Sequence, residues 1–181
     1  SDPASSGEDV VEERDAAAGC PLTIVPTDGG TSPNERAPNG NYLFGRAVYL
    51  VTATELAASG LANGTVPSAI GWHYATAPGV AATGTLIVYL QNTTDTTNLK
   101  DTTWSTAVVG MTVVHNSAST ALPDTTAPFD IPFSGGSPFT YTGGGLYVAF
   151  DAQYPVGTLS TTTVVWCNST GLPSGLLGAQ G

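Results

Sequence analysis

Short hydrophobic runs recur along the chain and are separated by segments rich in Gly, Pro, Asn, Asp, Ser and Thr. The most continuous run, residues 85–91, is too short for a typical helix and has no polar face, so it predicts a strand covered on both sides. Other runs alternate apolar and polar residues or are bounded by turn residues, which is typical of strands. These further predicted strands lie at 20–26, 42–51, 66–74, 106–115, 129–133, 146–150 and 158–167.

One segment between the predicted strands has the signature of a short helix. Thr52 and Glu55 have the spacing of a capping box, in which each side chain binds the backbone N–H of the other residue. Gly60 is suited to end such a helix, because glycine readily adopts the left-handed backbone conformation found there. The pattern therefore predicts slightly more than one helical turn within residues 52–60.

Composition favours an all-β protein with one domain. The chain has 181 residues, which suits a single core, and only 10% of them are charged. With about eight or nine short strands and frequent turn signals, we expect a single jelly-roll-like β-sandwich with extended terminal segments. We expect an acidic N-terminal extension over residues 1–19, the sandwich domain over 20–167 and a C-terminal tail over 168–181.

The charge balance is strongly acidic. Four basic residues stand against 14 acidic ones, which gives a formal net charge of −10. Binding to nucleic acid or to an anionic membrane depends on clustered positive charge, which this sequence lacks. No apolar run has the length needed to span a bilayer, so membrane insertion is not expected. The sequence begins without Met or a signal peptide, as a processed secreted protein would, and we expect an extracellular or cell-surface location.

The two cysteines, Cys20 and Cys167, stand near opposite ends of the chain. In an exported protein the simplest interpretation is one disulfide that ties the first predicted core strand to the last. Loop entropy alone would make so long a closure worth on the order of 4–5 kcal/mol. Two buried free thiols are the alternative.

Side chains suited to catalysis are few. A shared metal site for His73 and His115 is a less simple interpretation than two separate strand or rim histidines. Glu55 and Asp151 are the acids best placed to form a glycosidase pair, but a helix cap and a strand end explain them as well. We therefore expect no enzymatic activity and no cofactor. Aspartates in or near loops leave Ca²⁺ as the one candidate ion, with solvated loop acids as the alternative: Asp95, Asp101, Asp124, Asp130 and Asp151.

Aromatic residues suggest a binding function. Trp72 and Trp166 stand in predicted strands, and aromatic residues at such positions usually belong to the core. Trp104 follows a polar connection, so it is the candidate ring for stacking on a sugar. Glycans are the partners that this interpretation implies.

Residues 41–152 carry a series of motifs whose order and spacing resemble a β-sandwich module of secreted and cell-surface proteins of certain Gram-negative bacteria. The motifs are AVYLVTATEL at 47–56, GTVPSAI at 64–70, LIVYLQNTT at 86–94, DTTW at 101–104 and PFTYTGGGL at 138–146. Members of that family usually accompany adhesive or repetitive domains in long exported proteins. The resemblance covers roughly three-fifths of the chain and brings no catalytic residues with it.

The triplet Asp-Thr-Thr occurs three times, each time in or beside a predicted loop. It is similar to the O-glycosylation acceptor of the bacteria that carry this family, which makes Thr96, Thr102 and Thr125 candidate acceptors. Such triplets also arise by chance in a Thr-rich chain. Three sequons would accept N-linked sugar in a host with that machinery: Asn63, Asn92 and Asn168.

Low charge, the paired cysteines and the absence of a catalytic motif favour a structural or adhesive surface protein. We expect copies of the chain to join head to tail into a filament by β-strand addition, in which a terminal segment of one copy completes a sheet of the next. Residues 9–16 and 20–26 are the candidate donor segments. A carbohydrate-binding module of a secreted protein is the alternative, and an exposed aromatic platform would favour it.

Overall fold

The fold is all-β, as predicted, and is built from two antiparallel sheets. The computed structural model describes residues 37–40, 42–74, 76–155 and 176–180. The larger sheet has the strand order β4-β3-β6-β1-β7 and the smaller one pairs β2 with β5. The strands of the larger sheet are β1 (Phe44–Val51), β3 (Ala82–Thr93), β4 (Thr112–Leu122), β6 (Gly145–Gln153) and β7 (Leu176–Gln180). The smaller sheet consists of β2 (Ala69–Trp72) and β5 (Phe129–Pro132), and the helices are α1 (Ala53–Ser59) and α2 (Trp104–Ala107).

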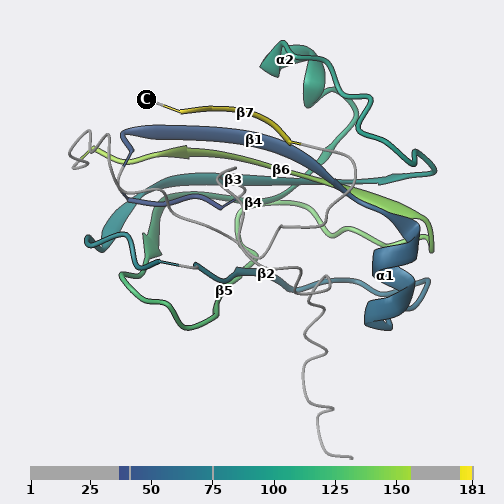
Figure 1. Cartoon of the computed structure of the whole chain (residues 1–181), viewed down its shortest axis with the longest axis horizontal. Coiled ribbons are helices and arrows are strands. Elements are labelled where there is room, and N and C mark those ends of the chain that lie inside the picture. Colours follow the sequence, from purple (N-terminus) through teal and green to yellow (C-terminus); the bar gives the residue numbers. More distant parts are fainter. Residues whose placement is uncertain (1–36, 41, 75, 156–175, 181) are drawn as a thin grey trace, which may run out of the picture.

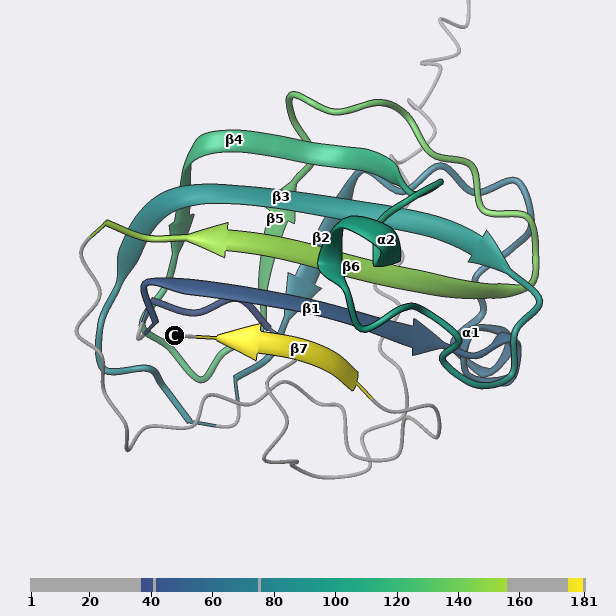
Figure 2. The ribbon, with the colours of Figure 1, turned by 90° about the horizontal axis from the view of Figure 1, so that it is seen from above.

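The two sheets form separate layers, with β2 and β5 under the five-stranded sheet and α2 on its opposite face (Figure 1). Figure 2 shows the five long strands side by side, with β4 and β7 at the two edges. Helix α1 follows β1 and lies at the end of the sheet where β1 ends (Figure 1).

The main core fills the space between the two sheets. Trp72 of β2 is buried, as predicted, and its ring lies edge-on to Phe150 of β6 at 6.1 Å between centroids. Its indole N–H donates to the Tyr49 hydroxyl at 3.3 Å, so the polar atom of this large side chain is satisfied within the core. The Tyr74 hydroxyl donates to the Pro38 carbonyl at 2.6 Å, which ties residues 37–40 to the same core.

The longest stretch buried on both faces is in β6, with a shorter one at Ala47–Val51 of β1, and not in the run at 85–91. Six consecutive residues of β6, from Tyr147 to Ala152, are buried, because β3 and β1 flank this strand and both of its faces are covered. Residues 85–91 belong to β3, whose side chains alternate between buried and half-buried. Leu86, Val88 and Leu90 face the main core, while the side chains between them face the layer of α2.

Helix α1 forms as its sequence predicts. The Thr52 hydroxyl accepts the Glu55 N–H at 3.3 Å, and the Glu55 carboxylate accepts the Thr52 N–H at 2.8 Å. Gly60 ends the helix with a φ of 83°, which is a left-handed conformation. Leu56 is buried in the main core, so the capped helix also closes the end of the sandwich.

The strand expected at 106–115 begins later and ends later. Residues 104–107 form α2, and β4 runs on through residues 116–121, which are small or polar, to Leu122. This extension pairs with β3 and not with the smaller sheet, with register shifts between Gly84 and Leu86 and between Val88 and Tyr89. At its other edge, the Asn116 and Ser137 N–H groups donate to the carbonyls of Ser134 and Val113, each at 2.8 Å. The loop after β5 therefore covers part of this edge.

The C-terminal segment contributes a strand that the hydrophobic pattern did not predict. Residues 176–180 of the expected tail form β7, which pairs with β1 from Gly45↔Gln180 to Tyr49↔Leu176. Because β6 and β7 are both antiparallel to β1, they run in the same direction on its two sides. The strands expected at 20–26 and 158–167, the extension over residues 1–19, and Trp166 lie outside the described residues.

Candidate functional site

Within the described part of the chain, the face of the larger sheet that carries α2 is covered over only half of its length. Near α2, the side chains of Val48, Leu50, Tyr147 and Ala149 form a second, smaller core with Ala107. Toward the beginning of β1 the same face has no such layer among the described residues, and Phe44 and Arg46 are about 40% exposed there (41% for the Phe44 residue, 39% for the Arg46 side chain). Functional side chains are therefore available at this end of the sheet.

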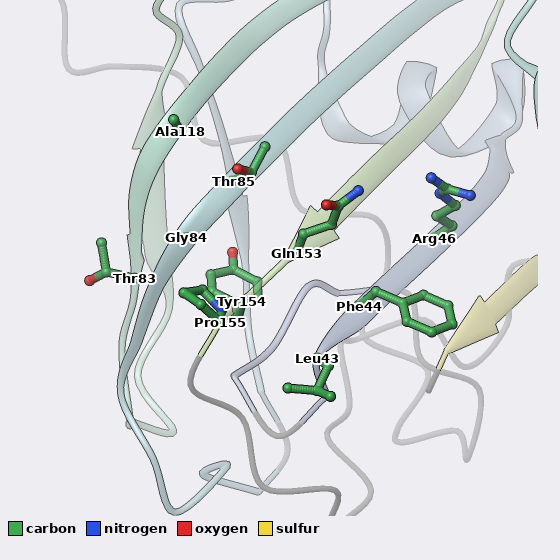
Figure 3. Close-up of a pocket in the computed structure, with 10 residues that line it drawn as sticks. All are labelled: Leu43, Phe44, Arg46, Thr83, Gly84, Thr85, Ala118, Gln153, Tyr154 and Pro155. Carbon is green, nitrogen blue, oxygen red and sulfur yellow. The ribbon is translucent and has the colours of Figure 1, made fainter.

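This uncovered end forms a solvent-open hollow with a volume of about 790 Å³ (Figure 3). It lies where β1 and β3 begin and where β6 ends. The lining combines apolar, hydroxyl, amide and guanidinium groups: Leu43, Phe44, Arg46, Thr83, Gly84, Thr85, Ala118, Gln153, Tyr154 and Pro155. We refer to this site as the hollow.

Arg46 is held in place by two neighbours. Its Nε donates to Asp151 Oδ2 at 2.9 Å, and the two residues are register partners on β1 and β6. Its guanidinium carbon lies 5.5 Å from the centre of the Trp104 ring, which is a cation–π contact. Asp151 is only 7% exposed, and its Oδ1 atom has no hydrogen-bond partner among the described residues.

Trp104 belongs to the structure around α2. Its ring lies edge-on to the Tyr89 ring with centroids 6.0 Å apart. The Arg46 guanidinium also lies against the Trp104 ring. Burial raises the pKa of Tyr89, and the charge of nearby Asp151 adds to this effect. The half-buried Trp104 thus anchors α2 to the sheet and does not line the hollow.

Phe44, Gln153 and Thr85 form a row across three strands at the hollow. Gln153 is the register partner of Phe44 on one side and of Thr85 on the other. Sequence reasoning missed Phe44, although the strand alternation puts it on the same face as Arg46. The pattern carries no information on which half of that face a helix covers.

The loop before α2 is fixed by Tyr147. Its hydroxyl donates to Asp95 Oδ2 at 2.6 Å and accepts the Leu99 N–H at 2.9 Å. Burial and the hydrogen bond to Asp95 raise the pKa of Tyr147 to about 12. The Lys100 ammonium lies 5.0 Å from the centre of the Tyr147 ring and donates to Gln91 Oε1.

The aspartates of all three Asp-Thr-Thr triplets have structural partners. Besides Asp95, the Asp101 carboxylate accepts the Thr103 N–H at 2.6 Å, and the Asp124 carboxylate accepts the Gly79 N–H at 2.8 Å. These bonds explain the aspartates without a modification. Of the candidate O-linked acceptors, Thr96 and Thr102 are exposed, whereas Thr125 is half-buried and accepts the Ala127 N–H at 3.0 Å.

The N-linked candidates differ in the same way. Asn63 is exposed. The Asn92 amide donates to the Thr140 carbonyl at 2.8 Å and accepts the Thr142 N–H at 3.0 Å, so a sugar on this nitrogen would have to break a loop contact. Asn168 lies outside the described residues, as do both Cys20 and Cys167, the residues of the expected disulfide.

The side chains considered for catalysis and metal binding each make a separate structural contact. Glu55 caps α1 and Asp151 binds Arg46. His115 is buried at 3% exposure, accepts the Ser134 N–H at Nδ1 and contacts Thr120 Oγ1 through Nε2 at 2.8 Å. Within the described part of the chain, no group of three or more His, Cys, Asp or Glu side chains is arranged to hold a metal ion.

Comparisons with known proteins found no matching family model, no similar curated protein and no similar solved structure. Among the residues that the structure describes, no helix combines the length and apolar character needed to cross a membrane.

Proposed function

We propose that this protein is a non-enzymatic structural or adhesive protein of the cell exterior, whose copies join head to tail by β-strand addition. The donor in this proposal is the C-terminal strand β7, and the acceptor is the edge of β1. The observation that carries the proposal is the position of β7, the last described strand along the chain, which forms the outer edge of the larger sheet beside β1.

The acceptor edge has the properties that strand addition needs. β1 is paired with β6 on its inner side over eight residues, and its side chains from Ala47 to Val51 are buried. The hydrogen bonds on the inner side of β1 therefore do not involve β7. Without β7, residues 45–49 would present unpaired N–H and C=O groups, and such an edge readily pairs with another chain.

The donor is attached through a long connection. Residues 156–175 separate the described end of the β6 region from β7, and about 20 extended residues reach at most roughly 70 Å. That reach is sufficient for pairing with the same copy or with a neighbouring one. Pairing with a neighbour is a heterologous contact, and repetition of such a contact builds an open chain of copies.

The polar side chains also support a structural role. Glu55 and Asp151, the acids best placed for hydrolysis, are committed to the cap of α1 and to Arg46. His115 is enclosed between β4 and the loop after β5. Each of these groups stabilises a junction between elements.

Single-cysteine variants test whether β7 pairs between copies. Gly45 and Gln180 are register partners, and a Cβ at Gly45 would meet its nearest neighbour, a Phe150 ring atom, at 3.8 Å, so Gly45→Cys fits. The variants Gly45→Cys and Gln180→Cys are made separately in a Cys20→Ser/Cys167→Ser background, unfolded, mixed and refolded together. Since each chain carries one thiol, a disulfide between the two variants forms only between copies.

We expect a non-reducing gel of the mixture to show linked dimers that neither variant forms alone. A matched control replaces Gln180→Cys with Ala57→Cys, which is exposed on α1 and has no strand partner. If the mixture gives no more dimer than this control, while a Gly45→Cys/Gln180→Cys double variant closes its disulfide within single chains, β7 pairs within its own copy and the proposal fails.

Electron microscopy of deletion variants identifies the donor. Deleting residues 176–181 should abolish filaments, whereas deleting residues 1–19 should leave them. The opposite result would return the donor role to the N-terminal segments 9–16 or 20–26.

A further inference from the structure

The hollow combines an exposed aromatic ring with uncommitted polar side chains. Phe44 is 41% exposed, and the neighbouring Leu43 is 39% exposed, so an apolar surface borders the site. A single exposed apolar residue is ordinary on a protein surface. Here the ring stands in one row with Gln153 and Thr85 on adjacent strands, which places hydrogen-bonding groups beside an apolar platform (Figure 3).

The polar groups of this row are free to bind a ligand. Within the described residues, neither the Gln153 amide nor the Thr85 hydroxyl makes a side-chain hydrogen bond, and Gln153 is exposed. An amide offers two donors and an acceptor, and a hydroxyl offers one donor and acceptor lone pairs. This mixture of donors and acceptors matches the hydroxyl groups of a sugar.

Arg46 adds donors whose position is fixed. Asp151 binds its Nε, and the Trp104 ring lies against its guanidinium. The other guanidinium N–H groups have no hydrogen-bond partner among the described residues. Because the side chain is already held, a ligand that binds it loses less conformational freedom than it would on a free arginine.

The electrostatics of the site favour an uncharged ligand. Asp151 neutralises Arg46, which is the only charged residue in the described part of the lining, and the whole chain carries a formal net charge of −10. An anionic ligand would meet this acidic background without an unpaired cation at the site.

We propose that the hollow is a binding site for a neutral oligosaccharide. The Phe44 ring stacks on the C–H face of one sugar unit, while Gln153, Thr85 and Arg46 bind its hydroxyl groups. Asp151 and Trp104 are positioning residues that hold Arg46. This site differs from the stacking position expected at Trp104, whose ring is engaged by Arg46 and Tyr89. The proposal does not depend on strand addition, because it is argued from ligand-binding side chains of β1, β3 and β6 alone.

Isothermal titration calorimetry of the full chain tests the site with named probes. The neutral probes are cellohexaose, xylohexaose, mannohexaose and chitohexaose, and the acidic probe is a galacturonic acid hexamer. We expect at least one neutral probe to bind and the acidic probe to bind no better. If none of the neutral probes binds at millimolar concentration, or if the acidic probe binds more tightly, the assignment is wrong.

Variants locate the binding. Phe44→Ala and Gln153→Ala should each weaken the bound probe about tenfold or more, since each removes the burial or bonding of one whole side chain. Leu99→Ala is the matched control, because Leu99 is 71% exposed and does not line the hollow. All three positions are on the surface, and circular dichroism checks that the variants are folded. Equal binding by Phe44→Ala and Leu99→Ala would place the ligand elsewhere and overturn the proposal.

Discussion

Two buried tyrosines give a sharp test of how polar groups act in this sandwich. Tyr147 and Tyr154 are each only 2% exposed, and burial raises the pKa of both. The Tyr147 hydroxyl has three partners, the Asp95 carboxylate at 2.6 Å, the Leu99 N–H at 2.9 Å and, more distantly, the Thr97 carbonyl at 3.4 Å. The Tyr154 hydroxyl is buried and has no partner among the described residues. Replacing each tyrosine with phenylalanine removes one oxygen from two very different environments.

The expected changes in the free energy of unfolding have different sizes and signs. Hydrogen bonds to charged groups contribute about 1.5–3 kcal/mol, so Tyr147→Phe should cost about 2–3 kcal/mol. A buried hydroxyl without a partner is unfavourable by about 1–3 kcal/mol, so Tyr154→Phe should be neutral or stabilising. Urea unfolding at pH 7, followed by tryptophan fluorescence, measures both values. If Tyr154→Phe destabilises the protein as much as Tyr147→Phe does, the hydrogen-bond argument is wrong.

A double-mutant cycle assigns the loss to one contact. Asp95→Ala removes the acceptor, and its effect should overlap strongly with that of Tyr147→Phe because both changes break the same bond. We expect a coupling energy of about 1–2 kcal/mol. Additive effects would show that the Tyr147 hydroxyl stabilises the fold through partners other than Asp95, namely the Leu99 N–H and the Thr97 carbonyl.

Three further predictions concern single positions. Gly84→Ala should destabilise the protein by about 3 kcal/mol or more in urea unfolding. The reason is that a Cβ at residue 84 would overlap the Gln153 carbonyl and lie 2.7 Å from the Tyr154 ring. Gly45→Ala is the control and should be nearly neutral, because a Cβ at residue 45 has space. Burial lowers the pKa of His115 below its usual 6.5, so the folded state favours the neutral ring. The contribution of His115 to the free energy of unfolding should therefore be constant above about pH 6.5 and fall as the pH drops below that value. His115→Gln should remove this part of the slope when unfolding is measured as a function of pH. Thr52→Ala should cost about 1 kcal/mol in thermal unfolding through loss of the α1 cap, and a change within experimental error would contradict that role.

Local signals in the sequence were sufficient for the local features. The capping box of Thr52 and Glu55, the stop at Gly60 and the burial of Trp72 follow from spacing and residue type, and the structure confirms each of them. The all-β class follows from the many short runs and turn residues. None of these inferences requires knowledge of which strand pairs with which.

Strand order could not be read from the hydrophobic pattern in the same way. The run at 85–91 is apolar on both sides, yet it belongs to a strand whose second face is half-buried, because the central position goes to β6. The pairing of β1 with β6 joins residues about one hundred positions apart, such as Arg46 and Asp151. Residues this distant leave no periodic signal.

The hollow and β7 were missed for related reasons. Strand alternation puts Phe44 and Arg46 on one face, but the exposure of Phe44 depends on where α2 lies along that face. The segment 176–180 contains glycine and alanine and lacks the β-branched residues and the alternation that predict a strand. Its pairing with β1 supplies the stabilisation that its own sequence does not indicate.

The position of β1 in the sheet has a consequence for synthesis. β1 leaves the ribosome about one hundred residues before β6, its inner partner, and β7, its outer partner, comes later still. At roughly 5–20 residues per second, β1 waits on the order of 5–20 s for β6 and a few seconds more for β7. During that interval both of its edges are open. The nascent chain therefore cannot complete its larger sheet until both β6 and β7 have been synthesised.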